Sequence, residues 1–417
     1  MQVVFVLVSV FGAIYFSLRA RVDYFSLAYF SAIIYFLPGF FGRASYHIGG
    51  EWRELDIIPE VYAIMTVVVF SVILVSFLIG RRNEVAPAKF SYSRVSKFLL
   101  IVSLLSLFGL SATFIEAGAA IFHPDKNVVM EAIGRWYILY SYSAVIGLPV
   151  AYLAKHRFFF VFFFCLLVFD VYIGFRSSLA IAVLSVFLLY FSSVPEKRPL
   201  LARWRMVFLV VLLGVFLFSI KHVLWAVKAG DMTAVLSAIG QPDFYWRAIT
   251  KSEPFVIQST LNEVVLRGFR TEFDHVSAVV YQLLFFSDKL GLTASSFNDY
   301  FQGALFPGVD YGMASNIWAQ MWSAGGWPLL IFFVLFFNMV IAAFNRTLVC
   351  GNVFVRAGFA PMASYWVFYI HRNDLAYMVN IEKRLFVLWL VAFLGVAFIF
   401  SFARSAQGFG ADGVRRR

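Results

Sequence analysis

Long apolar runs constrain this chain more than any other feature of its sequence. Stretches of about 18 or more mostly apolar residues, the length a helix needs to cross roughly 30 Å of hydrocarbon, recur along the whole chain. Backbone groups in lipid must be hydrogen-bonded within their own segment, so such runs are helices rather than open strands. We therefore predict an all-α, polytopic membrane protein. The eleven predicted spans are 2–18, 24–41, 61–80, 98–116, 136–153, 158–175, 178–193, 206–225, 327–344, 353–370 and 385–403.

The composition agrees with this class. Of 417 residues, 62% are hydrophobic and only 14% are charged, which is more apolar surface than a water-soluble core could bury. We expect residues 1–417 to form a single integral membrane domain. The first run lacks the charged start and small-residue cleavage site of a removable signal peptide, so we expect it to be retained. The two cysteines, Cys165 in a span and Cys350 in a loop, suggest neither a disulfide framework nor a cysteine metal site.

Basic residues predict the orientation of the spans. They gather in alternate connections, which the positive-inside rule assigns to the cytoplasm. These are Arg19 and Arg21, Arg81 to Lys97, Lys155 and Arg157, Lys197 to Arg205, Arg346 and Arg356, and Arg404 to Arg417. The N-terminus is then expected outside and the C-terminus inside the cytoplasm. The net charge of +11 is thus largely a topology signal and does not call for a nucleic-acid partner.

Residues 227–326 form the one long connection, and we expect it on the outer face. A connection of this length is rarely idle in a compact protein, so it is the prime candidate for function. Its charged residues alternate with aromatic ones. The apolar run at 279–286 is too short to span the bilayer and predicts an interfacial or re-entrant helix.

Arginines from separate parts of the chain are expected on the same outer face. The sequence GFRSS puts Arg176 in a tight outer turn, and HRND puts Arg372 at another outer helix end. A guanidinium binds phosphate bidentately and is weakly hydrated enough to work near lipid, whereas aromatic rings stack on sugars. The combination suits a lipid-linked pyrophosphoryl saccharide, as the substrate of an enzyme or the cargo of a transporter. Each arginine has the alternative of snorkelling to lipid headgroups.

Three stretches resemble O-antigen polymerases of the Wzy type. Gly312–Phe337 (GMASNIWAQMWSAGGWPLLIFFVLFF) is similar to their hinge of small residues leading into a span. Gly174–Tyr190 (GFRSSLAIAVLSVFLLY) resembles their Gly-x-Arg turn opening an apolar helix, and His371–Asn380 (HRNDLAYMVN) lies where they carry an arginine before the last span. Where the family often has an acidic residue, this chain has Ala319 or Gln320.

The resemblance implies a GT-C-like glycosyltransferase with one long periplasmic loop. Such proteins take a glycan carried on undecaprenyl pyrophosphate and transfer it as a block to another lipid-linked repeat unit. The transfer takes place on the periplasmic side of the bacterial inner membrane. No metal and no cofactor is expected, and the expected partners are the lipid-linked oligosaccharide, membrane lipid, a flippase and a chain-length regulator.

That reaction assigns roles to particular residues. Fixed arginines would stabilise the charge that develops on the leaving pyrophosphate. The candidates for this role are Arg176, Arg247, Arg270 and Arg372, with Arg267 in reserve. The acceptor hydroxyl needs a base. The candidates are His275 first, with Glu253 and Glu272 as competitors, although His275 could instead be a hydrogen-bonded structural histidine.

Two rival functions fit the same sequence. An O-antigen ligase would share the fold, donor and arginines but would use a lipid A-core acceptor. A non-enzymatic flippase of lipid-linked oligosaccharide would need no catalytic residue, and it predicts paired repeats with charged residues along a central cavity. We find no internal repeat in the sequence, which favours the enzyme.

Overall fold

The computed structural model describes residues 1–19, 21–79, 91–193, 199–284, 290–292, 295–309 and 311–414. The chain divides into two compact units, and each is described by itself. The first unit contains Met1–Glu84, Tyr190–Leu348 and Ala363–Lys383. The second unit contains Val85–Leu189, Val349–Met362 and Arg384–Arg417.

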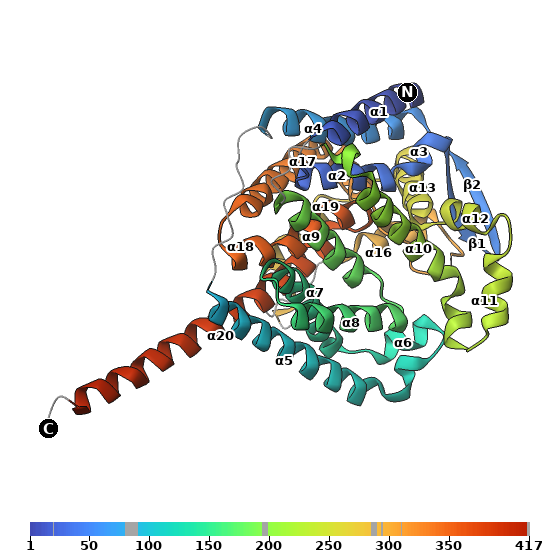
Figure 1. The fold of residues 1–417 in the computed structure, drawn as a ribbon. Coiled ribbons are helices and arrows are strands. Elements are labelled where there is room, and N and C mark those ends of the chain that lie inside the picture. The colour runs from blue at the N-terminus through green and yellow to red at the C-terminus, as the bar shows by residue number, and fades with distance from the viewer. Residues whose placement is uncertain are drawn as a thin grey trace. The chain divides into compact units, whose positions relative to one another are not determined.

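The first unit combines helices from both ends of the chain with one small sheet (Figure 1). Its N-terminal elements are α1 (Gln2–Leu18), α2 (Tyr24–Tyr35), α3 (Leu37–Phe41), β1 (Arg43–Ile48), β2 (Glu51–Asp56) and α4 (Pro59–Ile79). Then come η2 (Leu200–Arg203), α10 (Trp204–Lys228), α11 (Met232–Ile239), α12 (Phe244–Thr250), α13 (Glu253–Leu266), α14 (Asp274–Ser277), α15 (Val279–Leu283), α16 (Phe297–Leu305), α17 (Ile317–Val349) and η4 (Ile370–Arg372).

The second unit is helical in its described residues. Its elements are α5 (Tyr92–Ala117), η1 (Gly118–Phe122), α6 (Lys126–Ala132), α7 (Arg135–Leu153), α8 (Arg157–Ile173), α9 (Ser177–Ser193) and α18 (Val353–Gly358). Four helices contain residues of both units, namely α9, α17, α19 (Ala360–Tyr369) and α20 (Leu375–Val414). In the second unit α7 packs against α5, α8 and α18. Gly109 permits a close approach there, since a Cβ at that position would lie 2.5 Å from the backbone nitrogen of Tyr140.

Within the described residues, five helices are long and apolar enough to cross a membrane. They are Pro59–Ile79, Tyr92–Phe122, Arg135–Leu153, Ile317–Val349 and Val353–Arg372. Shorter apolar helices lie at Gln2–Leu18, Tyr24–Tyr35, Ser177–Ser192 and Val207–Phe216. The chain is therefore a predominantly helical membrane protein, as the apolar runs predicted. The count of eleven spans and the GT-C-like architecture stay predictions.

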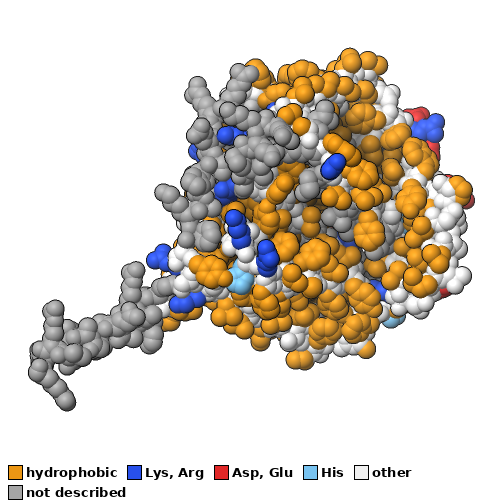
Figure 2. All heavy atoms as spheres, viewed as in Figure 1, with side chains coloured by type: hydrophobic (Ala, Val, Ile, Leu, Met, Phe, Trp, Pro, Cys, Tyr) orange, Lys and Arg blue, Asp and Glu red, His pale blue; other side chains and the backbone are white. Residues whose placement is uncertain are grey.

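Apolar side chains on the outside of these helices fit a lipid environment. Leu78 is 70% exposed, Ile115 85% and Phe332 65%, although each lies within a long apolar helix. Hydrophobic side chains also cover much of the face drawn in Figure 2. Water-soluble proteins rarely expose apolar surface on this scale, so these side chains are suited to contact with lipid tails.

Several predicted spans differ from the helices that form, and two of them have a clear local cause. Residues 24–41 are divided into α2 and α3, because in a continuous helix Pro38 would have no N–H for the carbonyl of Ile34 and its ring would clash with that carbonyl. Residues 327–344 belong to the longer helix α17, which begins at Ile317 and is kinked at Gly326. Gly326 has φ 60° and ψ −149°, a conformation that almost only glycine adopts.

The antiparallel hairpin of β1 and β2 was not predicted from the sequence. Its strands pair Arg43 with Asp56 through to Ile48 with Glu51, and Gly49 and Gly50 form the turn with positive φ angles. Strand β1 packs against α13, and the hairpin lies beside α12 and α13 in Figure 1. The hairpin lies between the predicted spans 24–41 and 61–80, in the first outer connection. This contact therefore joins that connection to the long one at 227–326.

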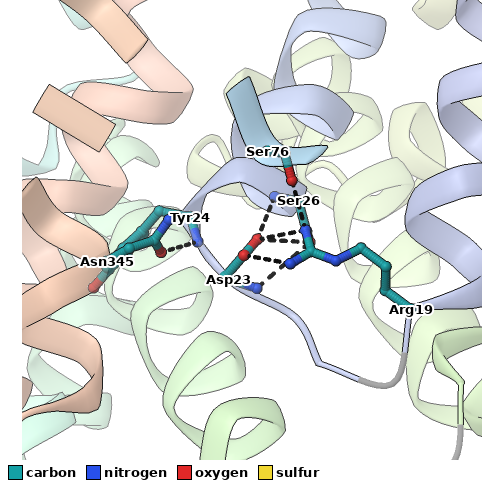
Figure 3. A network of polar contacts seen from close by, with 6 residues as sticks. All are labelled: Arg19, Asp23, Tyr24, Ser26, Ser76 and Asn345. Carbon is teal, nitrogen blue, oxygen red and sulfur yellow. Dashed lines mark hydrogen bonds and ion pairs between the residues drawn. The ribbon is translucent and has the colours of Figure 1, made fainter. Parts of the chain in front are cut away.

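A polar network ties four helices together where α1 is followed by α2 (Figure 3). Arg19 forms an ion pair with Asp23 at 2.8 Å and donates a hydrogen bond to Ser76 of α4 at 2.9 Å. Asp23 in turn accepts from the backbone N–H of Ser26 and caps α2. The side-chain oxygen of Asn345 in α17 accepts from the N–H of Tyr24 at 2.9 Å. This basic residue of the predicted cytoplasmic face therefore has a structural role.

The long connection at 227–326 is built mainly of short helices. It contains α11 to α16 and the first turns of α17. The run at 279–286, predicted as an interfacial or re-entrant helix, forms α15 over Val279–Leu283, while residues 285 and 286 lie outside the described residues. Contacts of α13 with α2, α3 and β1 hold this connection against the N-terminal helices of the first unit.

Candidate functional site

The stretch HRND at residues 371–374 is the centre of a buried polar network in the first unit. It follows α19 and precedes α20, so two helix ends meet at this short segment. Side chains from α13, from the start of α16 and from the first turns of α17 all reach it. Three separate parts of the long connection are thereby brought together at one place.

Arg372 and Glu253 form a bidentate ion pair within this network. The Nη2 atom of Arg372 lies 2.6 Å from Oε1 of Glu253, and Nη1 lies 2.8 Å from Oε2. The guanidinium also lies over the ring of Tyr369, 5.0 Å from its centroid. The two charged side chains are 29% and 25% exposed, so the pair is partly desolvated and still accessible. The Nε atom of Arg372 is buried without a hydrogen-bond partner.

Glu253 is well placed by its own helix. It is in the first turn of α13, after Ser252 at the N-cap and before Pro254. A carboxylate there interacts favourably with the positive end of the helix dipole, and proline is tolerated because the N–H it lacks has no intrahelical partner. The local sequence therefore fixes both the helix start and the position of this carboxylate.

His371 lies in an aromatic enclosure beside the ion pair. It is fully buried, and its Nδ1 accepts a hydrogen bond from the indole N–H of Trp318 at 3.1 Å. The rings of Tyr35 and Phe36 lie 5.6 and 5.5 Å from the imidazole. An Nδ1 atom that accepts leaves the proton on Nε2, and this atom is buried without a partner.

Gln320 connects His275 to the HRND stretch. Its side-chain nitrogen lies 3.1 Å from Nε2 of His275, and its oxygen accepts from the backbone N–H of Leu375 at 2.9 Å. The Nδ1 atom of His275 lies 2.9 Å from the backbone oxygen of Glu272. Both ring nitrogens of His275 thus have protein partners and the residue is buried, whereas the side chain of Glu272 is exposed. The geometry of His275 is that of a structural histidine.

Arg270 lies at the kink of α17. Its Nη1 donates to the backbone oxygen of Trp322 at 2.7 Å, and its guanidinium lies 5.6 Å from the Trp322 ring centroid. A helix that ends leaves carbonyl groups without intrahelical donors, and a cation is favourable there. The neighbouring Thr271 is fixed as well, since its N–H donates to the backbone oxygen of Ser323 at 3.1 Å. Arg270 therefore stabilises the first segment of α17.

Two other candidate arginines pair within their own helices. Arg247 forms an ion pair with Asp243 at 2.8 Å and a hydrogen bond with Gln241, and its side chain is 43% exposed. Arg267 forms an ion pair with Glu263 at 2.5 Å, and its side chain is 49% exposed. The polar partners of both arginines thus lie outside the HRND stretch. Among the predicted site residues of the first unit, Glu253 and Arg372 pair with each other directly. His275 and Arg270 instead contact Gln320 and Trp322 in the first turns of α17, which also carry the Trp318 side chain that contacts His371.

Arg176 belongs to the second unit and is half-buried there. It follows Gly174, whose φ of 122° permits the turn that the GFRSS motif predicted. The N–H groups of Gly174 and Phe175 both donate to the backbone oxygen of Asp170. Whether Arg176 joins the other arginines at one diphosphate stays a prediction.

A buried carboxylate fixes the turn that carries Arg176. Asp170 is fully buried, and it accepts hydrogen bonds from the hydroxyl of Tyr137 at 2.5 Å and from Ser141 at 3.0 Å. Ser141 also lies 2.6 Å from the hydroxyl of Ser178 at the start of α9. The sequence shows Asp170 as a lone acidic residue in an apolar run, which is a recognisable signal of a specific role. Its partners come from other helices and could not be read from the sequence.

Asp374 and Asn316 were not given roles from the sequence. Asp374 is buried and accepts from Ser296 at 2.7 Å and from the N–H of Phe297 at 3.0 Å. Asn316 caps α17 by accepting from the N–H of Trp318 at 2.9 Å. An asparagine before an apolar helix is a readable capping signal. The partner of Asp374 lies 78 residues away, so no local pattern indicates it.

Comparison with known proteins leaves this site to be interpreted from its own geometry. No protein-family model, curated protein or solved structure matches this chain. Among the residues that the structure describes, no group of three or more His, Cys, Asp or Glu side chains could hold a metal ion. The side chains at the HRND stretch offer a guanidinium, a carboxylate and aromatic rings.

Proposed function

We propose that this chain is a membrane glycosyltransferase of the O-antigen polymerase type. It transfers an oligosaccharide repeat unit en bloc from undecaprenyl pyrophosphate to another lipid-linked repeat unit. The transfer takes place on the periplasmic face of the bacterial inner membrane, and the protein's own side chains supply the catalytic groups. The observation that carries the proposal is the accessible bidentate pair of Arg372 and Glu253.

The guanidinium of Arg372 is suited to a diphosphate. Carboxylate and phosphate groups both present two oxygens to the two N–H groups of an arginine, so a phosphate of the donor can take the position that Glu253 holds here. Tyr369 limits the movement of the guanidinium through its ring contact. A fixed cation of this kind stabilises the negative charge that grows on the leaving pyrophosphate more than it stabilises the bound donor.

Glu253 is then the best candidate for the base. Once the donor phosphate has taken the guanidinium, its carboxylate is free to accept the proton of the acceptor hydroxyl. The hydroxyl oxygen forms a bond to the anomeric carbon, the bond from that carbon to the phosphate oxygen breaks, and the lipid pyrophosphate leaves with the electron pair. His275 is a weaker candidate because Gln320 and the backbone of Glu272 engage both of its ring nitrogens.

The remaining parts of the proposal concern the membrane arrangement. We propose eleven spans in a GT-C-like architecture, with a periplasmic N-terminus and a cytoplasmic C-terminus. In this arrangement the hairpin β1–β2, the segment 227–326 and the HRND stretch all lie on the periplasmic side. Arg270 near the kink of α17 would add positive charge around the donor.

A reconstituted reaction tests the proposal. The purified protein in lipid nanodiscs is incubated with one lipid-linked repeat unit and no other component, and the glycan products are separated by size. We expect a ladder of products that differ by whole repeat units. Failure to extend the repeat unit, with protein that is monodisperse and folded, would contradict the proposed function. A product that forms only on a lipid A-core acceptor would identify a ligase instead.

A further inference from the structure

The hairpin β1–β2 carries a row of aromatic rings that the proposed transfer does not use. His47 and Trp52 are opposite each other in the strand register, and their ring centroids are 5.6 Å apart. The ring of Tyr311 continues the row, 6.4 Å from His47, and its hydroxyl accepts from the backbone N–H of His47 at 3.2 Å. All three residues are half-buried, so each is partly exposed at the surface.

Charged side chains lie next to Trp52 in this row. The Nζ atom of Lys251 lies 5.6 Å from the ring centroid of Trp52. Along β2 the residues Glu51, Arg53, Glu54 and Asp56 are all exposed. Aromatic faces next to hydrogen-bonding groups match the two kinds of surface that a sugar ring presents, its C–H faces and its hydroxyl groups. The carboxylates beside the row make an anionic lipid headgroup a poor ligand for it.

The row is fixed next to the Arg372–Glu253 pair. Ser45 of β1 donates a hydrogen bond to the backbone oxygen of Thr250 at 3.1 Å, which holds the hairpin at the junction of α12 and α13. Lys251, which contacts Trp52, is two residues before Glu253, so their Cα atoms are at most about 7 Å apart. A glycan whose reacting end lies at Glu253 can therefore extend onto this row.

We propose that His47, Trp52 and Tyr311 form a saccharide-binding subsite for the glycan next to the reacting sugar. The identity of the ligand rests on the proposed function, whereas the position of the subsite rests on the hairpin and its contacts. The rings would bind sugar units that do not react, and so hold the glycan in place while its end is transferred.

Direct binding provides the first test. The probe is the free oligosaccharide released by mild acid from the lipid-linked repeat unit, titrated by calorimetry into the full protein in nanodiscs. We expect Trp52→Ala to raise the Kd by about tenfold, a typical effect of truncating a central aromatic contact, and Trp52→Phe to raise it less. Trp204→Ala is the matched control, because Trp204 is 60% exposed on α10 and lies outside the proposed subsite. Unchanged affinity in Trp52→Ala would overturn the subsite; if that variant does not fold, His47→Ala and Trp52→Phe provide the same comparison.

Kinetics separate this inference from the proposed function. With lipid-linked substrates, Trp52→Ala should raise the KM and leave kcat nearly unchanged, as expected when a contact binds substrate and transition state equally. If wild-type protein binds the oligosaccharide through Trp52 but makes no polymer, the proposed function is wrong and the subsite stands. If polymer forms and Trp52→Ala behaves as wild type in both assays, the function stands and the subsite is wrong.

Discussion

Replacing Arg372 tests the proposed mechanism most directly. The two N to O distances of 2.6 and 2.8 Å and the 29% and 25% exposure of the side chains define the pair. Charge centres about 4 Å apart attract by roughly 4 kcal/mol at an effective dielectric constant of about 20. Desolvation and solvent screening offset much of this attraction, so we expect a coupling free energy of about 1–2 kcal/mol between Arg372 and Glu253. A double-mutant cycle on the free energy of unfolding would measure it.

The loss of activity should be larger than the loss of stability suggests. Removing one fixed donor from the charge of a transition state typically costs a factor of about 10² to 10³ in kcat. We expect Arg372→Ala to lose activity by this factor while the protein remains folded in the membrane. Arg372→Lys should restore little, since an ammonium group keeps the charge but cannot make the planar two-point contact. The measurement is the initial rate of repeat-unit extension by purified variants in nanodiscs.

Glu253→Gln distinguishes a base from a residue that only positions Arg372. The amide has nearly the same shape and can still accept from the guanidinium, but it cannot take the proton of the acceptor. We expect a fall in kcat of about 10² to 10⁴ with the protein folded.

Two results would refute these roles. Wild-type kcat/KM in Arg372→Ala would refute the diphosphate-binding role of Arg372. Wild-type kcat in Glu253→Gln would refute the role of Glu253 as base.

Four further predictions follow from single positions. Arg247→Ala should change the extension rate by no more than about twofold, as for a substitution at an exposed side chain paired within its own helix, and a large loss would show that it binds substrate. Gly326→Ala should lower the free energy of unfolding by about 1–3 kcal/mol, because alanine is strained at φ 60° and ψ −149°; an unchanged thermal midpoint in detergent would contradict this. Asp170→Leu should cost about 1–3 kcal/mol through the unsatisfied hydroxyl of Tyr137, and thermal unfolding as stable as wild type would rule out that bond as a stabilising contact. A reporter fused at Gly230 should be active on the periplasmic side, and a cytoplasmic signal would reverse the proposed orientation.

Local features of the sequence determined where many helices begin and end. The apolar runs predicted the membrane class, and helices form at most of their positions. Gly174 has a positive φ, which permits the tight turn predicted at GFRSS. The same local rules explain Pro38, at which one predicted span is divided into α2 and α3. These features can be predicted from the sequence because each depends on the hydrophobicity of one helix length or on the backbone freedom of one residue.

Only the tertiary structure decided which polar groups meet. Arg372 and Glu253 are 119 residues apart, and Ser296 and Asp374 are 78 apart, so no spacing in the sequence pairs them. The sequence proposed His275 as the first base, but its environment depends on Phe297 and Tyr300 of α16 and on Gln320 of α17. An ion pair or a buried histidine is defined by distances of a few ångströms between distant segments. Such distances are set by the packing of whole helices, which local composition does not encode.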